Sequence, residues 1–176
     1  MAMYEVLLWM FATGILTRIV DMAVDDGMRL PGYLAYLAGV AYGILIAYVV
    51  ANYPLLSPPC LGVVIAVMLT GKIDRKPHIA GIGAMVLFLG LWGLPRIDVF
   101  LLAIFLAGGI TDEIVSDLAD GGKIKGRAAK VLEKRIVLEA VTFSFSLATG
   151  QWIIFLGMFS FDSGHLLTKG IRERFI

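Results

Sequence analysis

Residues 33–53 read YLAYLAGVAYGILIAYVVANY, a stretch that contains no charged side chain. A helix needs about 17 to 25 mainly apolar residues to cross the hydrocarbon of a bilayer, so this stretch predicts one membrane-spanning helix. Further apolar stretches lie approximately at residues 4–20, 58–72, 79–95, 97–111, 131–149 and 151–168. The pattern predicts an all-α fold, a polytopic transmembrane helical bundle of about seven spans.

The composition is typical of an integral membrane protein. Hydrophobic residues make up 59% of the chain and charged residues only 16%, against about 25% charged residues in a soluble domain. With 176 residues, we expect a single transmembrane helical domain at residues 1–176. The first apolar stretch is followed by Arg18 and Asp21 rather than by a small-residue cleavage site, so we expect it to stay as the first helix.

The distribution of lysine and arginine predicts the topology, because cationic loops stay on the cytoplasmic side of a membrane. With seven spans, every lysine and arginine except Arg96 falls on one side. A merged final span at about residues 136–161 would give six spans and move three cationic residues to the outside, namely Lys169, Arg172 and Arg174. We therefore expect seven spans in the cell membrane, with the N-terminus outside and the C-terminus cytoplasmic.

Four groups of aspartates interrupt the apolar stretches, and in this topology all four lie on the cytoplasmic face. The groups are Asp21 with Asp25 and Asp26, then Asp74, then Asp112 with Asp117 and Asp120, and finally Asp162. Side chains three, four, seven or eight residues apart share a face of a helix. Three polar stripes follow from this spacing: Thr17, Asp21 and Asp25; Glu113, Asp117 and Asp120; and Asp162, His165 and Lys169.

The stripes indicate a polar site, because an aspartate near a helix centre opposes membrane insertion by about 2.5 to 3.5 kcal/mol. Such a residue is by default a functional hypothesis. Aspartate oxygens suit Mg²⁺, which binds through one or two carboxylates plus substrate phosphates, and nearby lysine and arginine would neutralise phosphate charge. The alternative for each group alone is a solvated helix end. The two histidines, His78 and His165, lie on separate predicted helices and form no zinc signature.

Two motifs resemble those of the UbiA superfamily of intramembrane prenyltransferases, all-helical enzymes with two aspartate-rich motifs on one membrane face. In TRIVDMAVDDGMRLPG, residues 17–32, the matching positions are Thr17, Asp21, Asp25, Arg29 and Pro31. In TDEIVSDLADGGKIKG, residues 111–126, they are Glu113, Asp117, Asp120 and Lys123. The resemblance implies two Mg²⁺ ions on a prenyl diphosphate, held by Asp21, Asp25, Asp117 and Asp120. Thr17 replaces an asparagine, the second motif is respaced, and the family usually has nine spans.

A second, lower-ranked resemblance is to the CDP-alcohol phosphotransferases. The stretch SDLADGGKIKGRAA, residues 116–129, is similar to the opening Asp-x-x-Asp-Gly of their signature. Its later Gly-x-x-x-Asp-x-x-x-Asp is absent downstream of Asp120.

The leading hypothesis is a Mg²⁺-dependent, prenyltransferase-like membrane enzyme that acts on an isoprenoid or lipid diphosphate at the cytoplasmic interface. Its metal ligands would be Asp21, Asp25, Asp117 and Asp120, and its phosphate contacts Arg18, Arg29, Lys123 and Lys169. Asp162 and His165 are the candidate catalytic residues, which would orient an acceptor or move a proton. The alternatives are an ion-coupled transporter and a non-catalytic membrane subunit. The expected partners are membrane lipids and the diphosphate substrate, with no nucleic acid, and the oligomeric state stays open.

Overall fold

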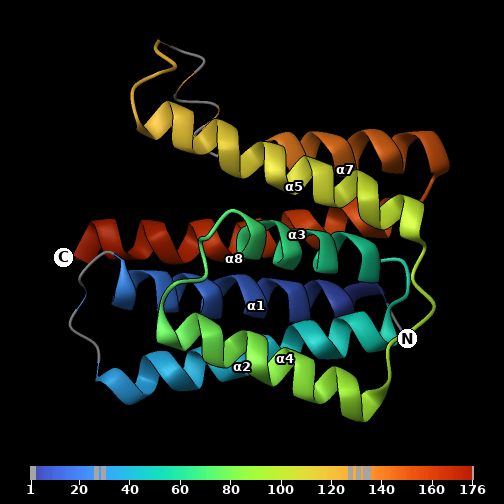
Figure 1. Cartoon of the computed structure of the whole chain (residues 1–176), viewed down its shortest axis with the longest axis horizontal. Helices are drawn as coiled ribbons and strands as arrows, with labels where there is room; N and C mark the ends of the chain where they lie inside the picture. Colours follow the sequence, from blue (N-terminus) through green and yellow to red (C-terminus); the bar gives the residue numbers. More distant parts are fainter. Residues whose placement is uncertain are drawn as a thin grey trace. The chain divides into compact units, whose positions relative to one another are not determined.

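The computed structural model describes residues 3–25, 28, 31–126, 129, 132 and 136–175. Within these residues the chain forms seven α-helices and no strand, which confirms the all-α prediction. The helices are α1 (Met3–Val24), α2 (Gly32–Asn52), α3 (Ser57–Leu69), α4 (Lys76–Trp92), α5 (Val99–Asp120), α7 (Ile136–Thr149) and α8 (Trp152–Phe175) (Figure 1).

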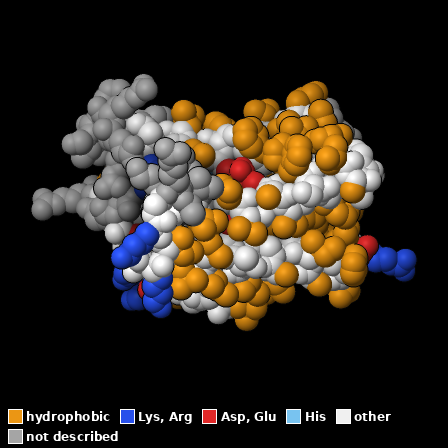
Figure 2. All heavy atoms as spheres, turned by 90° about the horizontal axis from the view of Figure 1, so that it is seen from above, with side chains coloured by type: hydrophobic (Ala, Val, Ile, Leu, Met, Phe, Trp, Pro, Cys, Tyr) orange, Lys and Arg blue, Asp and Glu red, His pale blue; other side chains and the backbone are white. Residues whose placement is uncertain are grey.

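Three of the described helices, α1, α2 and α5, are long and apolar enough to cross a membrane, judged by length and composition. Helices α3, α4 and α7 are apolar but shorter. This is fewer than the seven spans expected, so the full number of crossings stays a prediction. Large apolar side chains are nevertheless exposed on several helices, including Leu91, Val99 and Phe100, and apolar side chains cover much of the surface seen in Figure 2.

The final apolar region forms two helices rather than one. Gly150 ends α7 with a φ of +74°, a left-handed conformation that glycine adopts without steric cost. The Ser146 hydroxyl donates to the Gln151 carbonyl at 3.0 Å and accepts from the backbone N–H of Phe155 at 3.2 Å, which closes the turn. The separation of α7 from α8 agrees with the seven-segment interpretation of the sequence.

The chain divides into two compact units. Unit 1 contains residues 1–54, 73–96 and 156–176, and thus α1, α2, α4 and most of α8. Unit 2 contains residues 55–72 and 97–155, with α3, α5 and α7. The single domain expected at residues 1–176 stays a prediction.

Glycines allow the helices of unit 1 to approach closely. A Cβ atom added to Gly43 on α2 would overlap the backbone carbonyl of Gly81 on α4. A Cβ added to Gly14 on α1 would overlap the carbonyl of Phe161 on α8, and one added to Gly164 would overlap that of Phe11. Small residues at such crossings bring helix backbones together. They therefore fix the distances between polar side chains on these four helices.

Unit 2 packs around α5. Phe105 of α5 is fully buried and meets Phe145 of α7 edge to face, with ring centroids 5.7 Å apart. On the α3 side, a Cβ added to Gly62 would lie 2.9 Å from the backbone nitrogen of Leu106. Helix α5 begins where the Asp98 carboxylate accepts from the backbone N–H groups of Phe100 and Leu101, at 3.0 and 3.1 Å, a cap that satisfies amides left without helical partners.

Candidate functional site

The candidate site of unit 1 is centred on Asp21, in the last turns of α1. Its Oδ2 atom lies 2.9 Å from Nε2 of His165 on α8, and its Oδ1 atom lies 3.3 Å from Nε2 of His78 on α4. The Asp21 side chain is only 22% exposed. A carboxylate removed from water needs hydrogen-bonding or charged partners, and two imidazole rings from different helices fill this role.

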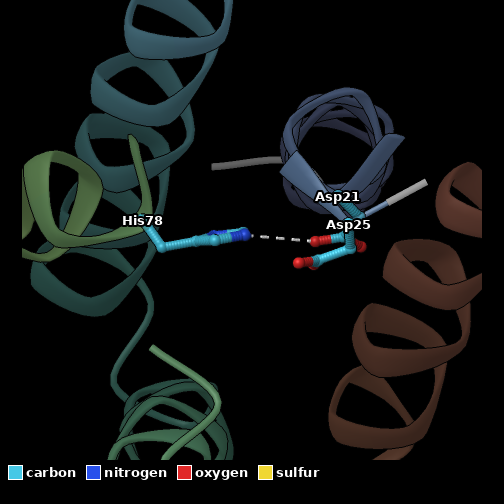
Figure 3. A group of neighbouring side chains, drawn as sticks. All are labelled: Asp21, Asp25 and His78. Carbon is cyan, nitrogen blue, oxygen red and sulfur yellow. Dashed lines mark ion pairs between the residues drawn. The ribbon is translucent and has the colours of Figure 1, made fainter. Parts of the chain in front are cut away.

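Asp25 completes a cluster of possible metal ligands. It lies one helical turn beyond Asp21, and carboxylate oxygens of Asp21 and Asp25 and a ring nitrogen of His78 all lie within 4.8 Å of one another. Figure 3 shows both carboxylates on the end of α1 with the His78 ring pointing toward them. Two carboxylates and an imidazole are a donor set that can bind a divalent cation.

A tyrosine on a fourth helix orients His78. The hydroxyl of Tyr42, on α2, lies 3.0 Å from Nδ1 of His78 and 3.4 Å from the His78 carbonyl oxygen. Both side chains are buried, with Tyr42 only 4% exposed. Hydrogen bonding to the far ring nitrogen fixes the orientation and tautomer of a histidine. Tyr42 is therefore an outer member of the cluster.

Two arginines give the cluster a cationic rim. Nη1 of Arg18 lies 4.0 Å from Oδ2 of Asp21, and the Arg18 side chain is 12% exposed. Nε of Arg75, the residue before α4, lies 3.6 Å from Oδ1 of Asp25 and 3.7 Å from Oδ2 of Asp74. The guanidinium group is the preferred partner of phosphate oxygens, so the cluster offers both cation ligands and anion contacts.

Helix packing explains why these residues meet. The close approach of α2 to α4 at Gly43 and Gly81 brings Tyr42 to His78. Helices α1 and α8 approach closely at Gly14 and Gly164. Gly14 lies about two turns before Asp21, and Gly164 directly precedes His165. The apolar helices thus act as the rigid frame of the polar cluster.

The predicted site residues of unit 1 are only partly brought together. The structure brings Arg18, Asp21 and Asp25 into the cluster, and His165 reaches Asp21 from α8. Asp162 is half-buried on α8, one turn before His165, and Lys169 is exposed one turn after it. Arg29 and Asp26 lie outside the described residues. The roles assigned to these residues from sequence stay predictions.

The predicted site residues of unit 2 lie in a different setting. Asp117 on α5 is 54% exposed and forms an ion pair with Lys72. Asp120, the last residue of α5, and Lys123, in the turn that follows, are exposed. Asp21 and Asp25 belong to unit 1, and a metal site that combines them with Asp117 and Asp120 stays a prediction of the resemblance.

Asp112 has a structural contact that accounts for its position off the predicted stripe. Its Oδ1 and Oδ2 atoms accept from the backbone N–H groups of Val137 and Leu138, each at 2.8 Å. These amides belong to the first turn of α7, where a negative charge is stabilising. Asp112 thus joins α5 to the start of α7.

Sequence reasoning missed His78 and Tyr42 as members of the site. The sequence alone predicts no role for His78, and Tyr42 lies within an apolar stretch that shows no polar pattern. One signal was present: His78 follows the loop that the predicted topology places on the same face as Asp21. No spacing rule, however, connects side chains on α1, α2 and α4. Comparison of the chain with models of known families, with curated proteins and with solved structures finds no match.

Proposed function

We propose that this protein is a multi-pass membrane enzyme that binds a divalent cation and the diphosphate of an isoprenoid or other lipid at the Asp21 cluster. The observation that carries the proposal is the convergence of donor atoms from Asp21, Asp25 and His78 within 4.8 Å. Ionisable groups gathered inside a bundle of apolar helices are costly to bury. They are retained most readily where they bind a ligand.

The arginine rim supports a phosphate-bearing ligand. Arg18 and Arg75 each lie beside a carboxylate of the cluster, so the anionic oxygens of a ligand bound there through a cation would lie close to guanidinium groups. Arg29 and Lys169 are the further phosphate contacts expected from sequence for this cluster. A ligand that carries both a divalent cation and several anionic oxygens fits this mixture of charges.

A groove in unit 1 supports the lipid part of the proposal. It has a volume of about 510 Å³, and its lining is apolar, with Leu16 and Ile19 from α1 and Leu34 and Leu37 from α2. Both helices are long and apolar enough to cross a membrane. An isoprenoid or acyl chain is the occupant that such a lining and such surroundings favour.

The proposed reaction is transfer of the lipid group from diphosphate to an acceptor. The bond between the lipid carbon and the diphosphate oxygen breaks, the acceptor bonds to that carbon, and the acceptor loses a proton. A bound cation would stabilise the charge of the departing diphosphate. Arg18 and Arg75 would hold the anion, and His165 would accept the proton. Asp162, one turn away on α8, would orient the acceptor.

The proposed topology has seven crossings, with the N-terminus outside and the C-terminus cytoplasmic. Every lysine and arginine except Arg96 then lies on the cytoplasmic side, as cationic loops prefer. Helices α1 and α8 run in the same direction (Figure 1), as do α2 and α4. Successive crossings alternate in direction, so the first and the seventh must run the same way. Helices α1 and α8 have this relation.

The test is incubation of the purified full-length protein in detergent or lipid with a labelled allylic diphosphate, a set of acceptors, and Mg²⁺ or Mn²⁺. We expect cation-dependent release of diphosphate that is lost in Asp21→Asn. Asp98→Asn is the matched control, because an asparagine also caps a helix and Asp98 lies outside the cluster. Absence of both binding and release with every acceptor would overturn the proposal.

A second candidate is an ion-coupled carrier, and one observation favours it. Tyr42, His78, Asp21 and His165 form an unbroken series of polar contacts across four helices, and such series occur in proton pathways of transporters. Flux across proteoliposomes that Asp21→Asn abolishes, in a protein that releases no diphosphate, would select the carrier.

A further inference from the structure

We propose that the cation site of this protein is a mixed carboxylate–imidazole site, with His78 as a ligand beside Asp21 and Asp25, and that it prefers Mn²⁺ or a similar first-row transition cation to Mg²⁺. The inference rests on the cation site of the proposed function and names the metal class that it takes. Neither the aspartate pattern of the sequence nor the resemblance built on it includes a histidine ligand.

The distances suit ligands of one cation. Donor atoms about 2.1 Å from a shared metal ion lie about 3.0 Å apart at adjacent octahedral positions and about 4.2 Å apart at opposite ones. The separation of 3.3 Å between Nε2 of His78 and Oδ1 of Asp21 falls within this range. All three donors lie within 4.8 Å, and Asp25, which is 52% exposed, has room for the small rotation that would shorten its distances.

The type of donor decides the metal class. Mg²⁺ prefers oxygen ligands in nearly ideal octahedral geometry and keeps several waters. Imidazole nitrogen binds first-row transition cations well, and carboxylate oxygen suits Mn²⁺. A site that combines His78 with two aspartates therefore favours Mn²⁺ over Mg²⁺, whereas a site of aspartates alone would not.

Tyr42 gives His78 a means of presenting a lone pair to the cation. A hydroxyl carries one hydrogen, and that of Tyr42 can reach either Nδ1 or the carbonyl oxygen of His78, at 3.0 and 3.4 Å. When the hydroxyl donates to the carbonyl, it accepts from Nδ1–H, and the lone pair of Nε2 is then available to a cation bound between Nε2 and Oδ1 of Asp21. A metal-bound histidine usually donates its second ring N–H to such a partner.

His165 and Arg18 leave one side of Asp21 open to the cation. Both lie on Oδ2, at 2.9 and 4.0 Å, whereas Oδ1 faces His78. A carboxylate oxygen only accepts hydrogen bonds, so Nε2 of His165 carries its hydrogen and donates it to Oδ2. His165 is thus a positioning residue for Asp21 in cation binding, because an outer hydrogen bond fixes a ligating carboxylate.

The test is direct cation binding to the purified full-length protein without substrate. Electron paramagnetic resonance reports Mn²⁺, because the signal of the aqueous ion is lost on binding, and Mg²⁺ is added as competitor. We expect the protein to bind Mn²⁺ at least about tenfold more tightly than Mg²⁺. His78→Ala should weaken Mn²⁺ binding by at least about tenfold and remove most of the preference.

Tyr42→Phe provides a milder variant, because it keeps the ring and removes only the hydroxyl. It should weaken Mn²⁺ binding by about 10- to 100-fold, as expected for an outer-shell contact, with the same melting temperature as Tyr36→Phe. Tyr36 is the matched control because it lies on α2 and is exposed. Equal affinity for Mn²⁺ and Mg²⁺, or Mn²⁺ affinity unchanged in both His78→Ala and Tyr42→Phe, would overturn the inference.

The outcome is distinguishable from that of the proposed function. Tight Mn²⁺ binding that depends on His78, in a protein that releases no diphosphate, would keep the metal site and reject the transferase. Diphosphate release that is as fast with Mg²⁺ as with Mn²⁺, and is unchanged in His78→Ala, would keep the transferase and reject the histidine ligand.

Discussion

The acidic residues of the two units are used in different ways. In unit 1, Asp21 is largely buried and contacts two histidines from two other helices. In unit 2, Asp112 caps the start of α7, and Asp117 is half exposed and pairs with Lys72. Aspartate is thus a possible metal ligand in unit 1 and a structural hydrogen-bond acceptor in unit 2. The partners, rather than the aspartates, distinguish the two uses.

The difference has a physical origin in what each carboxylate can reach. Asp112 accepts from two backbone N–H groups in the first described turn of α7, and one carboxylate satisfies both at once. Asp21 meets imidazole rings, which can exchange a hydrogen for a metal ion. A backbone amide keeps its hydrogen and does not bind a metal ion in its place, so the contacts of Asp112 are structural. We therefore expect function to depend on unit 1 contacts and stability on unit 2 contacts.

The largest expected effect is that of Asp21→Asn. Replacing the carboxylate removes a charged ligand between two histidines, and we expect cation affinity to fall by about 100-fold or more, which corresponds to about 2.8 kcal/mol. Asp117→Asn should change the affinity by less than about twofold, because Asp117 is exposed and paired with Lys72. Mn²⁺ titrations of both variants measure this. Equal losses would place the second aspartate motif in the cation site after all.

A packing change in unit 1 should have the next largest effect. A Cβ added to Gly81 would meet the Tyr42 ring at 2.6 Å, whereas one added to Gly83 on the same helix meets nothing within 4 Å. Gly81→Ala should therefore cost about 1 to 3 kcal/mol through overpacking and also weaken cation binding. Gly83→Ala is the control, and thermal unfolding in detergent with Mn²⁺ titration compares them. Equal behaviour of the two variants would show that close α2–α4 packing does not hold the cluster.

The loss of the cap on α7 should affect stability alone. Asp112→Ala leaves the N–H groups of Val137 and Leu138 without their acceptor, and we expect a loss of about 1 to 2 kcal/mol in the free energy of unfolding. Asp112→Asn should recover part of it, since an amide oxygen still accepts. Cation affinity should stay within about twofold of the original protein. A large fall in affinity with unchanged stability would move Asp112 from a structural to a functional role.

The smallest expected effect is that of the ion pair on unit 2. The Lys72 and Asp117 side chains are 35% and 54% exposed, so solvent screens the pair, and Lys72→Ala should cost no more than about 0.5 kcal/mol. Thermal unfolding at low and high salt provides the measurement, with Lys169→Ala as an exposed lysine for comparison. A loss above about 1 kcal/mol would show that unit 2 also contains a strongly coupled charge pair.

Much of the fold followed from local patterns. The apolar stretches predicted all seven described helices, and the distribution of lysine and arginine favoured two separate final segments, as α7 and α8 are. Helix lengths were less predictable, since α3, α4 and α7 are described over only 10 to 17 residues each. Helical spacing placed Asp21 and Asp25 on one stripe, and the two carboxylates do lie together.

Local patterns did not predict which residues contact Asp21 from other helices. His165 was selected for its spacing from Asp162 on one helix, but its hydrogen bond crosses to Asp21 on α1. His78 and Tyr42 are 36 residues apart, and no periodicity relates two helices. Their meeting depends on where α2 crosses α4, which the glycines at that crossing permit but do not by themselves specify.

The sequence by itself determined that the chain is helical and apolar and that Asp21 and Asp25 share one helix face, because hydrophobicity and helical period act over short stretches. Tertiary structure alone decided which of those residues share a site. Close helix crossings brought Tyr42, His78 and His165 around Asp21 and turned an aspartate stripe into a mixed cluster. Contacts between distant segments depend on packing of whole helix surfaces, and this information is not contained in any one stretch of the chain.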